Sequence, residues 1–375
     1  MDASARDVGY MTRALALAGR GLGRVEPNPM VGAVIVRGDE VVGEGCHARY
    51  GGPHAEVVAL GQAGPRAEGA ELFVTLEPCC HHGKTPPCTA AILKAGIRRV
   101  VAAVVDPFPQ VSGRGLAALR EAGAEVVTGP CEEQARRLNA AFFKRQATGL
   151  PLVIAKWAMT LDGRLASADG ESRWISSEES RRRVHEVRRV SDAVLVGSGT
   201  VAADAPSLTV RHVEPLPERG QPVRVVMDSS LSIDADREPA RSAGEVPVIV
   251  YTSAEALAAR ANRADALRRV GCEIVAVARA EGGVSPLAAL RDLGKRGMSR
   301  ALIEGGARIL GSFFAAGLVD RVMVFVSPRL LGSSDALGPV AGPAGRALAD
   351  AVALADFSCE RVGPDVLLQG RVGEF

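Results

Sequence analysis

The chain has 375 residues, which exceeds one ordinary domain and predicts two domains or three. Hydrophobic residues make up 47% and charged residues 23%, as in globular proteins, so the composition excludes a disordered chain. The net charge is only +2 and aromatic residues are only 4%, which argues against a nucleic-acid partner held by bulk charge or by base stacking.

The first 145 residues alternate helical and extended patterns. The N-terminal segment is amphipathic, and no stretch of the chain reaches the run of about 18 apolar residues that a membrane span needs, so we expect a cytoplasmic protein. Two apolar runs joined by Gly38 and Asp39 predict a hairpin. The expected strands are 31–36, 41–47, 71–76, 98–105 and 125–129, and the expected helices after the first are 54–62, 88–95, 115–123 and 132–145.

The segment 146–151 interrupts the helical pattern with Gly149 and Pro151, which predicts a boundary between domains at 1–147 and 148–375. In the second domain, Ser176 and Glu179 have the spacing of a capping box before a helix. The expected strands are 152–160, 192–197, 223–228, 246–252, 273–278, 301–305 and 322–327, with helices at 178–190, 254–270, 286–296 and 307–316. This alternation predicts an α/β fold in both domains, with largely parallel sheets covered by helices.

Cysteine and histidine gather in one window of the first domain. Four of the seven cysteines and four of the six histidines lie between residues 46 and 88, which in a cytoplasmic chain favours metal binding over disulfides. A hydrolytic zinc deaminase needs three protein ligands, an open position for water and a carboxylate that does not ligate. We therefore expect Zn²⁺ on His54, Cys79 and Cys88. Glu56 would then carry the proton from the activated water to the ring nitrogen and on to the leaving amine.

These residues also have ordinary explanations. A lone H-x-E is often a chance match, and a cysteine pair is often two buried small hydrophobes. Cys80 could compete with Cys79 as a ligand, and we favour Cys79 because the deaminase signature places the cysteine directly after proline. A structural zinc module is a further alternative, although a closed site has four protein ligands and no use for Glu56.

The segments PNPMVGAV (27–34), GCHARYGGPHAE (45–56) and TLEPCCHHGKTPPC (75–88) closely resemble the deaminase half of the bifunctional riboflavin-biosynthesis enzymes. The resemblance implies a cytidine-deaminase-like α/β/α domain that deaminates 2,5-diamino-6-ribosylamino-4(3H)-pyrimidinone 5′-phosphate. It also implies substrate contacts at Asn28, His47, His81, Lys84 and Asp106. The family usually has DPNPxVxG after the next strand, whereas Phe108 here replaces an amide that could reach the substrate.

The second half resembles the reductase domain of the same family, which is similar to dihydrofolate reductase. The matching segments are KWAMTLDG (156–163), SRWIS (172–176), VGSGTVAADAPSLTVR (196–211) and LIEGGARILGSF (302–313). The resemblance implies NADPH contacts at Ala158, Trp174, Thr200, Asp204, Gly306, Ala307, Arg308 and Ile309, and sugar-phosphate contacts at Lys156, Ser172, Arg188, Leu208, Arg211 and Glu304. Short Gly-rich turns are often only turns, and the absence of G-x-G-x-x-G argues against a standard Rossmann site.

The two resemblances together imply a bifunctional enzyme. The first domain would deaminate the pyrimidine, and the second would transfer hydride from NADPH to the ribosyl C1′ and open the ring to a ribityl chain. The expected partner is a phosphorylated pyrimidine, with no nucleic acid and no membrane, and the chain is expected to form a homo-oligomer, a dimer or a tetramer. The alternative is a nucleic-acid or free-nucleoside deaminase with an unrelated appended domain, which the near-neutral charge and scarce aromatic residues disfavour.

Overall fold

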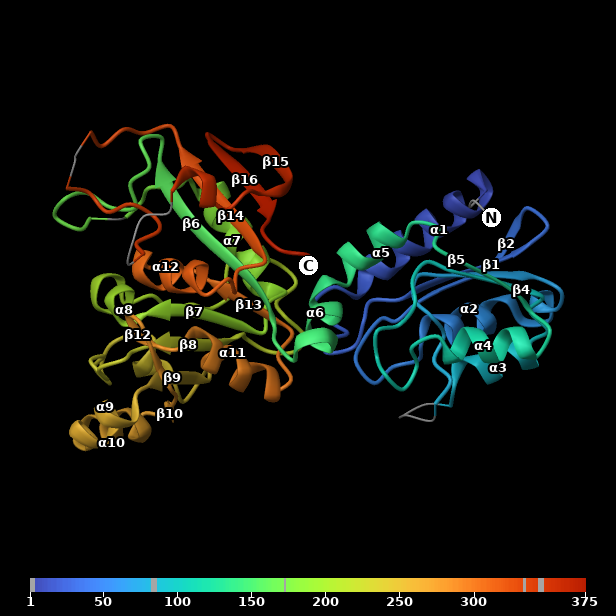
Figure 1. Cartoon of the computed structure of the whole chain (residues 1–375), viewed down its shortest axis with the longest axis horizontal. Coiled ribbons are helices and arrows are strands. Elements are labelled where there is room, and N and C mark those ends of the chain that lie inside the picture. Colours follow the sequence, from blue (N-terminus) through green and yellow to red (C-terminus); the bar gives the residue numbers. More distant parts are fainter. Residues whose placement is uncertain (1–3, 82–85, 172, 333–334, 343–346) are drawn as a thin grey trace. The chain divides into compact units, whose positions relative to one another are not determined.

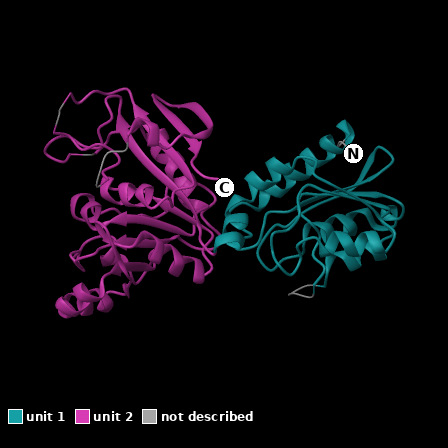
Figure 2. Cartoon of the chain, in the orientation of Figure 1, with its two compact units in different colours: residues 1–148 teal, residues 149–375 magenta. Residues whose placement is uncertain are grey.

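The structure is a computed structural model that describes residues 4–81, 86–171, 173–332, 335–342 and 347–375. The chain divides into two compact units, residues 1–148 and 149–375 (Figure 2). Each unit contains one large sheet with helices packed against it, so the predicted α/β class is confirmed. Within the described residues, no helix has the length and hydrophobicity needed to cross a bilayer.

The first unit is built on a five-stranded sheet with the order β2-β1-β3-β4-β5 (Figure 1). Strand β1 pairs antiparallel with β2, as the predicted hairpin requires, and with β3, whereas β3, β4 and β5 are parallel. The strands are β1 (Gly32–Arg37), β2 (Glu40–Cys46), β3 (Glu71–Val74), β4 (Arg99–Ala102) and β5 (Glu125–Thr128). The helices are α1 (Ala5–Ala18), α2 (Ala55–Ala63), α3 (Cys88–Lys94), α4 (Arg114–Glu121), α5 (Glu132–Leu138) and α6 (Ala140–Thr148).

Glycines bring the helices of this unit close to the sheet. A Cβ atom on Gly45 of β2 would lie 2.2 Å from the carbonyl oxygen of Ala55, so only glycine allows α2 to pack here. A Cβ on Gly32 of β1 would likewise lie 2.0 Å from the carbonyl oxygen of Ala14 in α1. Helices α2, α3 and α4 contribute to one buried cluster with the sheet, and α1 covers the other face (Figure 1). Because α2 packs closely against the sheet, the position of its N-terminus, where His54 lies, is fixed.

The second unit is built on a nine-stranded sheet with the order β10-β9-β8-β7-β13-β6-β14-β16-β15. The strands from β10 to β14 in this order are parallel, and β16 and β15 add antiparallel at one edge. These strands are β6 (Leu152–Thr160), β7 (Ala193–Gly197), β8 (Val223–Met227), β9 (Val248–Thr252), β10 (Glu273–Ala276), β13 (Arg300–Ile303), β14 (Arg321–Ser327), β15 (Ala355–Val362) and β16 (Asp365–Arg371). A separate small hairpin pairs β11 (Arg279–Ala280) with β12 (Gly283–Val284).

The helices of the second unit connect the parallel strands. They are α7 (Glu178–Arg189), α8 (Ser198–Asp204), α9 (Ala254–Ala259), α10 (Ala261–Arg269), α11 (Pro286–Lys295) and α12 (Ala307–Ala315). The core joins Leu290 of α11 and Phe313 of α12 to Leu195 and Ile303 of the central strands. Burial of these side chains packs one face of the sheet against α11 and α12. The carboxyl-terminal ends of the strands are then available to form a binding site.

Two predicted helices are each divided in the structure. The predicted helix 132–145 is α5 followed by α6, because the side chain of Asn139 at the break pairs with the backbone of Met30, with both hydrogen bonds at 2.8 Å. The predicted helix 254–270 is α9 followed by α10, with the break at Arg260, where φ is −126°. The tertiary bond of Asn139 overrides local helix propensity.

Other differences are local. The cap of α7 is Ser177 and not Ser176, because Ser177 Oγ accepts the backbone N–H of Ser180 at 3.2 Å. The sequence pattern does not predict α8, the hairpin of β11 and β12, or the C-terminal hairpin of β15 and β16. Strand β15 is exposed along almost its whole length, so it lacks the buried alternation that indicates a strand.

Candidate functional site

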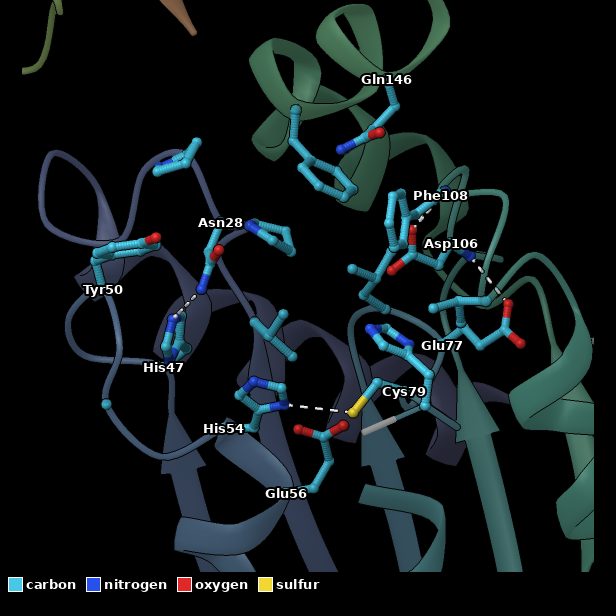
Figure 3. A pocket seen from close by; sticks show the side chains of 18 of the residues that line it. Asn28, His47, Tyr50, His54, Glu56, Glu77, Cys79, Asp106, Phe108 and Gln146 are labelled. Atoms are coloured by element: carbon cyan, nitrogen blue, oxygen red, sulfur yellow. Dashed lines mark hydrogen bonds between the residues drawn. The ribbon is translucent and has the colours of Figure 1, made fainter. Parts of the chain in front are cut away.

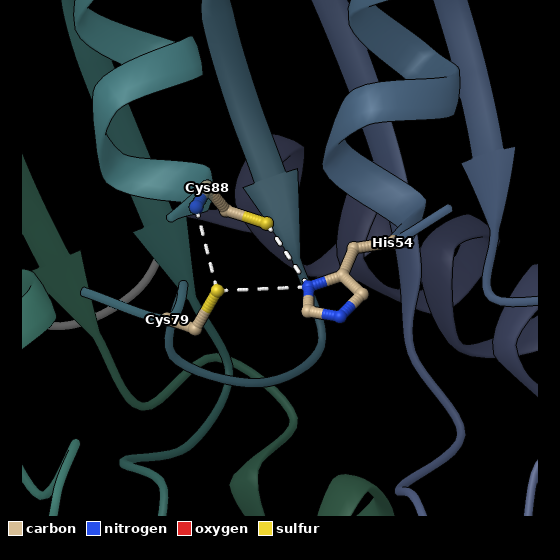
Figure 4. A group of neighbouring side chains, drawn as sticks. All are labelled: His54, Cys79 and Cys88. Atoms are coloured by element: carbon tan, nitrogen blue, oxygen red, sulfur yellow. Dashed lines mark hydrogen bonds between the residues drawn. The ribbon is translucent and has the colours of Figure 1, made fainter. Parts of the chain in front are cut away.

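Three side chains expected to bind zinc converge in the first unit (Figure 4). His54 Nδ1 lies 3.2 Å from Cys88 Sγ and 3.6 Å from Cys79 Sγ, and the three ligand atoms lie within 4.8 Å of one another. One imidazole nitrogen and two thiolates are a donor set that zinc prefers, and three protein ligands leave a fourth position open. The residues present therefore fit a catalytic zinc ion.

Local structure positions each of these ligands. His54 is the N-cap of α2, and Cys88 is the first residue of α3 and is fully buried. Cys79 lies in the loop after β3, where its Sγ accepts the backbone N–H of Cys88 at 3.3 Å. Hydrogen bonds from Cys88 and His54 lower the pKa of Cys79 well below that of an ordinary thiol, against the opposing effect of burial. Cys79 is thus held as the thiolate, the form that binds metal.

The competing cysteine lies apart from this group. Cys80 Sγ faces the carbonyl oxygen of Gln110 at 3.8 Å. Among the residues that the structure describes, the cluster of possible metal ligands contains Cys79 and not Cys80. The geometry favours the cysteine that follows proline.

A cavity of about 350 Å³ opens beside the three ligands, and Glu56 lines it (Figure 3). Glu56 lies in the first turn of α2 and is only 4% exposed, with its carboxylate near His54 and Cys79. Burial raises the pKa of Glu56 above its ordinary value. A carboxyl group with a raised pKa, next to a metal site and outside its ligand set, is suited to accept and donate protons.

Asn28 and His47 form one wall of the cavity. His47 Nδ1 lies 3.0 Å from the carbonyl oxygen of Pro53, which can only accept, so this nitrogen carries the proton. His47 Nε2 therefore accepts from Asn28 Nδ2 at 3.2 Å, and burial lowers the pKa of His47, which keeps the ring neutral. The amide nitrogen of Asn28 is used in this pair, and its oxygen remains to accept a hydrogen bond from a ligand.

Asp106 lines the cavity near Phe108 (Figure 3). Burial raises the pKa of Asp106 to about 6, although its Oδ1 accepts the backbone N–H of Phe108 at 2.8 Å. His81 also lines the cavity, and within the described part of the chain its buried Nδ1 has no hydrogen-bond partner. Lys84, the remaining substrate contact expected in this unit, lies outside the described residues.

Glu77 also lines the cavity, and the sequence pattern does not predict it as a site residue. Its buried carboxylate accepts four backbone N–H groups, from Asp106 (3.1 Å), Gly113 (2.8 Å), Gly115 (2.8 Å) and Leu116 (3.2 Å). These bonds hold the loop that carries Asp106 and the start of α4. The sequence contained one signal for Glu77. It is an acidic residue between an apolar strand and the Pro-Cys pair, and a residue at that position is expected to be buried.

In the second unit, an ion pair joins two residues expected to bind the sugar phosphate. Arg188 Nε and Nη2 donate to the two carboxylate oxygens of Glu304 at 2.5 Å and 2.8 Å, and Arg188 Nη1 donates to the carbonyl oxygen of Thr209 at 2.8 Å. The side chains of the pair are only 11% and 7% exposed. Burial by itself would raise the pKa of Glu304, but the charge of Arg188, its hydrogen bond and the charge of Lys156 lower this pKa to about 2.

Lys156 completes this charged group. It lies on β6, and the pairing of Ala155 with Ile303 of the neighbouring strand places Lys156 beside Glu304. Burial lowers the pKa of Lys156, while the negative charge of Glu304 opposes that effect. Arg211 lies close to the same group, because its backbone N–H donates to His185 Nδ1 at 3.1 Å and His185 lies on α7 with Arg188.

Two Gly-rich turns expected to bind NADPH lie against each other. Gly197 at the end of β7 donates its backbone N–H to the carbonyl oxygen of Gly305 at 3.0 Å. A Cβ on Gly306, the N-cap of α12, would lie 3.1 Å from Thr200 Oγ1, and a Cβ on Gly197 would lie 2.9 Å from Ile309 Cγ1. The carboxyl ends of two parallel strands and a helix N-terminus therefore meet, which fits the phosphates of a dinucleotide.

The other predicted contacts of this unit are more dispersed. Trp174 is 59% exposed, and the guanidinium of Arg181 lies 4.4 Å from its ring centre. Leu208 is 1% exposed, so almost none of its surface is available to a ligand. Ala158 lies on β6 and Asp204 ends α8, whereas Ala307 and Arg308 form the first turn of α12. Ser172 lies outside the described residues.

Comparisons with known proteins cover both units. Residues 4–104 match the family model of the cytidine and deoxycytidylate deaminase zinc-binding region, and residues 151–368 match that of the RibD C-terminal domain. The chain is 42% identical over 362 residues to riboflavin biosynthesis protein RibD of Aquifex aeolicus (strain VF5), covering 96% of this chain and 97% of that protein. It is 42% identical over 372 residues to RibD of Escherichia coli (strain K12), covering 97% and 98%.

Solved structures agree over the same length. RibD of Acinetobacter baumannii has a TM-score of 0.85 and 37% identity, covering 98% of this chain and 99% of that one. A diaminohydroxyphosphoribosylaminopyrimidine deaminase/5-amino-6-(5-phosphoribosylamino)uracil reductase from Thermotoga maritima has a TM-score of 0.82 and 35% identity, with the same two coverages of 98% and 99%. The similarity extends through both units.

Proposed function

The chain belongs to the RibD family of riboflavin-biosynthesis proteins, and from this premise we propose which of its residues carry each activity. It is a bifunctional deaminase and reductase, with a zinc-binding deaminase domain and a reductase domain of the NADPH-using type. An unrelated appended domain is therefore excluded. We assign deamination to residues 1–147 and reduction to residues 148–375.

In the deaminase domain, His54, Cys79 and Cys88 would hold the zinc ion. Bound zinc supplies a Lewis acid that lowers the pKa of a coordinated water to about 7. Glu56 would accept one proton of that water and deliver it to a ring nitrogen of the pyrimidine, and would afterwards carry the second proton of the same water to the leaving amine. The observation that carries this assignment is the convergence of three ligand atoms within 4.8 Å beside a buried carboxylate outside the set.

The proposed substrate of this domain is 2,5-diamino-6-ribosylamino-4(3H)-pyrimidinone 5′-phosphate. Asn28 would accept a hydrogen bond from the edge of the pyrimidine, held in orientation by His47. His81 and Asp106 line the same cavity and would meet other polar atoms of the substrate. Lys84 is proposed as a cation for the phosphate, by resemblance alone.

In the reductase domain, bound NADPH supplies a hydride for the ribosyl C1′. As the bond between C1′ and the ring oxygen breaks, that oxygen must take a proton, and Lys156 is the buried cation proposed to donate it. Arg188 is committed to Glu304 and Thr209, so we propose that it orients Glu304 toward the substrate and that Arg211 meets the phosphate. The Gly-rich turns around Thr200 and Gly306 would hold the cofactor, together with Ala158, Trp174, Asp204 and residues 307–309. Ser172 and Leu208 would contact the sugar phosphate.

A single assay tests both assignments. The phosphorylated diaminopyrimidine is supplied with NADPH, and ammonia and NADPH consumption are followed in the same tube. We expect ammonia release followed by NADPH oxidation. Absence of ammonia would overturn the deaminase assignment, and ammonia release without NADPH oxidation would overturn the reductase assignment.

We also propose that the protein is a cytoplasmic homo-oligomer, a dimer or a tetramer. All seven cysteines are free, which fits a reducing compartment. Leu330 and Leu348 of the second unit are 71% and 92% exposed, and exposed apolar side chains of this size are common in subunit interfaces. Light scattering of the purified protein tests this proposal, and a monomeric mass at micromolar concentration would contradict it.

A further inference from the structure

Phe108 occupies a fixed position in the deaminase cavity. Its backbone N–H donates to Asp106 Oδ1 at 2.8 Å, and its carbonyl oxygen accepts from the backbone N–H groups of Val111 at 2.8 Å and Ser112 at 3.1 Å. A residue bonded on both sides in this way cannot turn freely out of the loop. The backbone of Phe108 is therefore held in place, and the residue lines the cavity.

The surroundings of this ring are aromatic on one side and polar on the other. The centres of the Phe108 and His81 rings lie 5.8 Å apart, with the planes tilted by 55°. Figure 3 shows Phe108 and Asn28 on opposite sides of the cavity, with Glu56 near the metal ligands. A flat heterocycle has apolar faces and a polar edge, so it needs an aromatic surface for its face and an acceptor for its edge.

We infer that Phe108 is a substrate-binding residue of the deaminase, whose ring packs against the face of the substrate pyrimidine. This inference rests on the proposed deaminase function. An amide at position 108 would read polar atoms at the edge of the pyrimidine, whereas a phenyl ring contributes contact area that depends little on the ring substituents. Phe108 is not one of the possible metal ligands and its side chain has no proton to transfer, so its contribution belongs to substrate binding and not to proton transfer.

The test compares variants that keep or remove the aromatic face. Phe108→Leu should raise KM for the diaminopyrimidine by roughly 2- to 10-fold and leave kcat nearly unchanged, as expected for loss of one aromatic contact. Phe108→Tyr keeps the ring and should leave KM within about 2-fold of wild type. Equal KM values for the two variants, or a loss confined to kcat, would overturn the inference.

Controls separate this result from misfolding and from failure of the proposed function. Phe357→Leu makes the same chemical change on exposed β15 in the other unit and should leave KM unchanged. Zinc content and NADPH oxidation on the deaminated intermediate report whether each variant is folded. Phe108→Met, closer in volume, replaces the leucine variant if that variant loses zinc. If wild type releases no ammonia, the proposed function fails; if it does and Phe108→Leu keeps the wild-type KM, only this inference fails.

Discussion

The two units neutralise a buried carboxylate in different ways. Glu77 in the first unit accepts four backbone N–H groups, all from the segment 106–116, and these dipoles stabilise its negative charge. Glu304 in the second unit is paired with the guanidinium of Arg188 and lies beside Lys156. The bonds to Glu77 fix a loop without using another charged side chain. The pair of Arg188 and Glu304, by contrast, joins two charged residues that lie 116 positions apart in the chain.

This difference affects the chemistry available to each site. The first site leaves its metal ligands and Glu56 as the groups that react, and uses Glu77 only to hold the cavity wall. In the second site, the charged residues proposed to contact the substrate also pair with one another, so the same residues would stabilise the fold and bind the ligand. We therefore expect substitution of Glu56 in the first site to affect activity and not stability, and substitution of Glu304 in the second site to affect both.

The largest effect is expected from loss of a metal ligand, which should affect one unit only. Cys79→Ser removes one of three ligands, so zinc content and ammonia release should both fall to background. Cys80→Ser is the matched control at the adjacent position, and should keep zinc and deaminase activity. Metal analysis of both purified variants, with ammonia release, checks the prediction. Retention of zinc by Cys79→Ser together with its loss from Cys80→Ser would reverse the ligand assignment.

Replacing Glu56 should separate chemistry from metal binding in the same site. Glu56→Gln removes the proton carrier, and we expect kcat for ammonia release to fall by about 10² to 10⁴, with zinc retained and NADPH oxidation on the deaminated intermediate intact. Glu121→Gln at the end of α4 is a control for the loss of one exposed carboxylate. Simultaneous loss of both activities in Glu56→Gln would contradict independent domains.

The two sites also differ in how far the sequence predicts them. The rare residue types and short spacing of His54, Cys79 and Cys88 predicted a site that the structure brings together. The role of Glu77 could not be predicted, because its partners are backbone groups 29 to 39 residues further along the chain, where any residue type can donate. The pairing of Arg188 with Glu304 depends on where α7 packs against the sheet, and local pattern contains no information about that packing.

In the fold, too, local sequence patterns predict some elements and miss those that depend on contacts between distant residues. Strands with buried apolar residues, such as β6 and β7, were predicted close to their observed bounds, because burial on both faces leaves a continuous apolar run. The exposed edge strand β15 leaves no such run and was missed. The division between α5 and α6 was missed because it depends on the contact of Asn139 with Met30, 109 residues away.

Breaking the ion pair of the second unit should cost stability. Glu304→Gln leaves the charge of Arg188 buried without its partner, and we expect the free energy of unfolding to fall by about 3 kcal/mol, together with loss of reductase activity. Asp265→Asn breaks the exposed pair of Asp265 with Arg268, and should cost less than about 0.5 kcal/mol. Denaturant unfolding of both variants measures the two values. Equal losses would show that the buried pair is not a stabilising element.

The corresponding change in the first unit should have a smaller effect. Glu77→Gln replaces one accepting oxygen by a donor, so two of the four backbone N–H groups lose their acceptor and the free energy of unfolding should fall by about 2 kcal/mol. Because the loop carries Asp106, KM of the deaminase should rise more than kcat falls. Reductase activity should not change. Chemical unfolding and steady-state kinetics check these points, and a stability loss as large as that of Glu304→Gln would contradict the distinction between dipoles and ion pairs.

The smallest expected effect concerns the pH dependence of stability. Burial, with the charges of Arg188 and Arg211, lowers the pKa of His185 to about 4 in the folded protein, whereas an unfolded histidine has a pKa of about 6.5. Between these values the unfolded chain binds a proton that the folded chain does not, so His185 makes stability fall as the pH is lowered from 6.5 to 4. His185→Gln should reduce this slope in unfolding curves recorded at pH 7, 5 and 4.

Comparison of wild type with His185→Gln separates the contribution of His185 from the contributions of the other titratable groups. Asp106 has a pKa raised to about 6, so it acts in the opposite direction, stabilising the folded state as the pH falls, and it does so equally in wild type and in His185→Gln. Identical slopes in the two proteins would show that His185 is protonated in the folded state over this range. In that case its Nδ1 could not accept the N–H of Arg211, and the position proposed for Arg211 near the phosphate would lose its support.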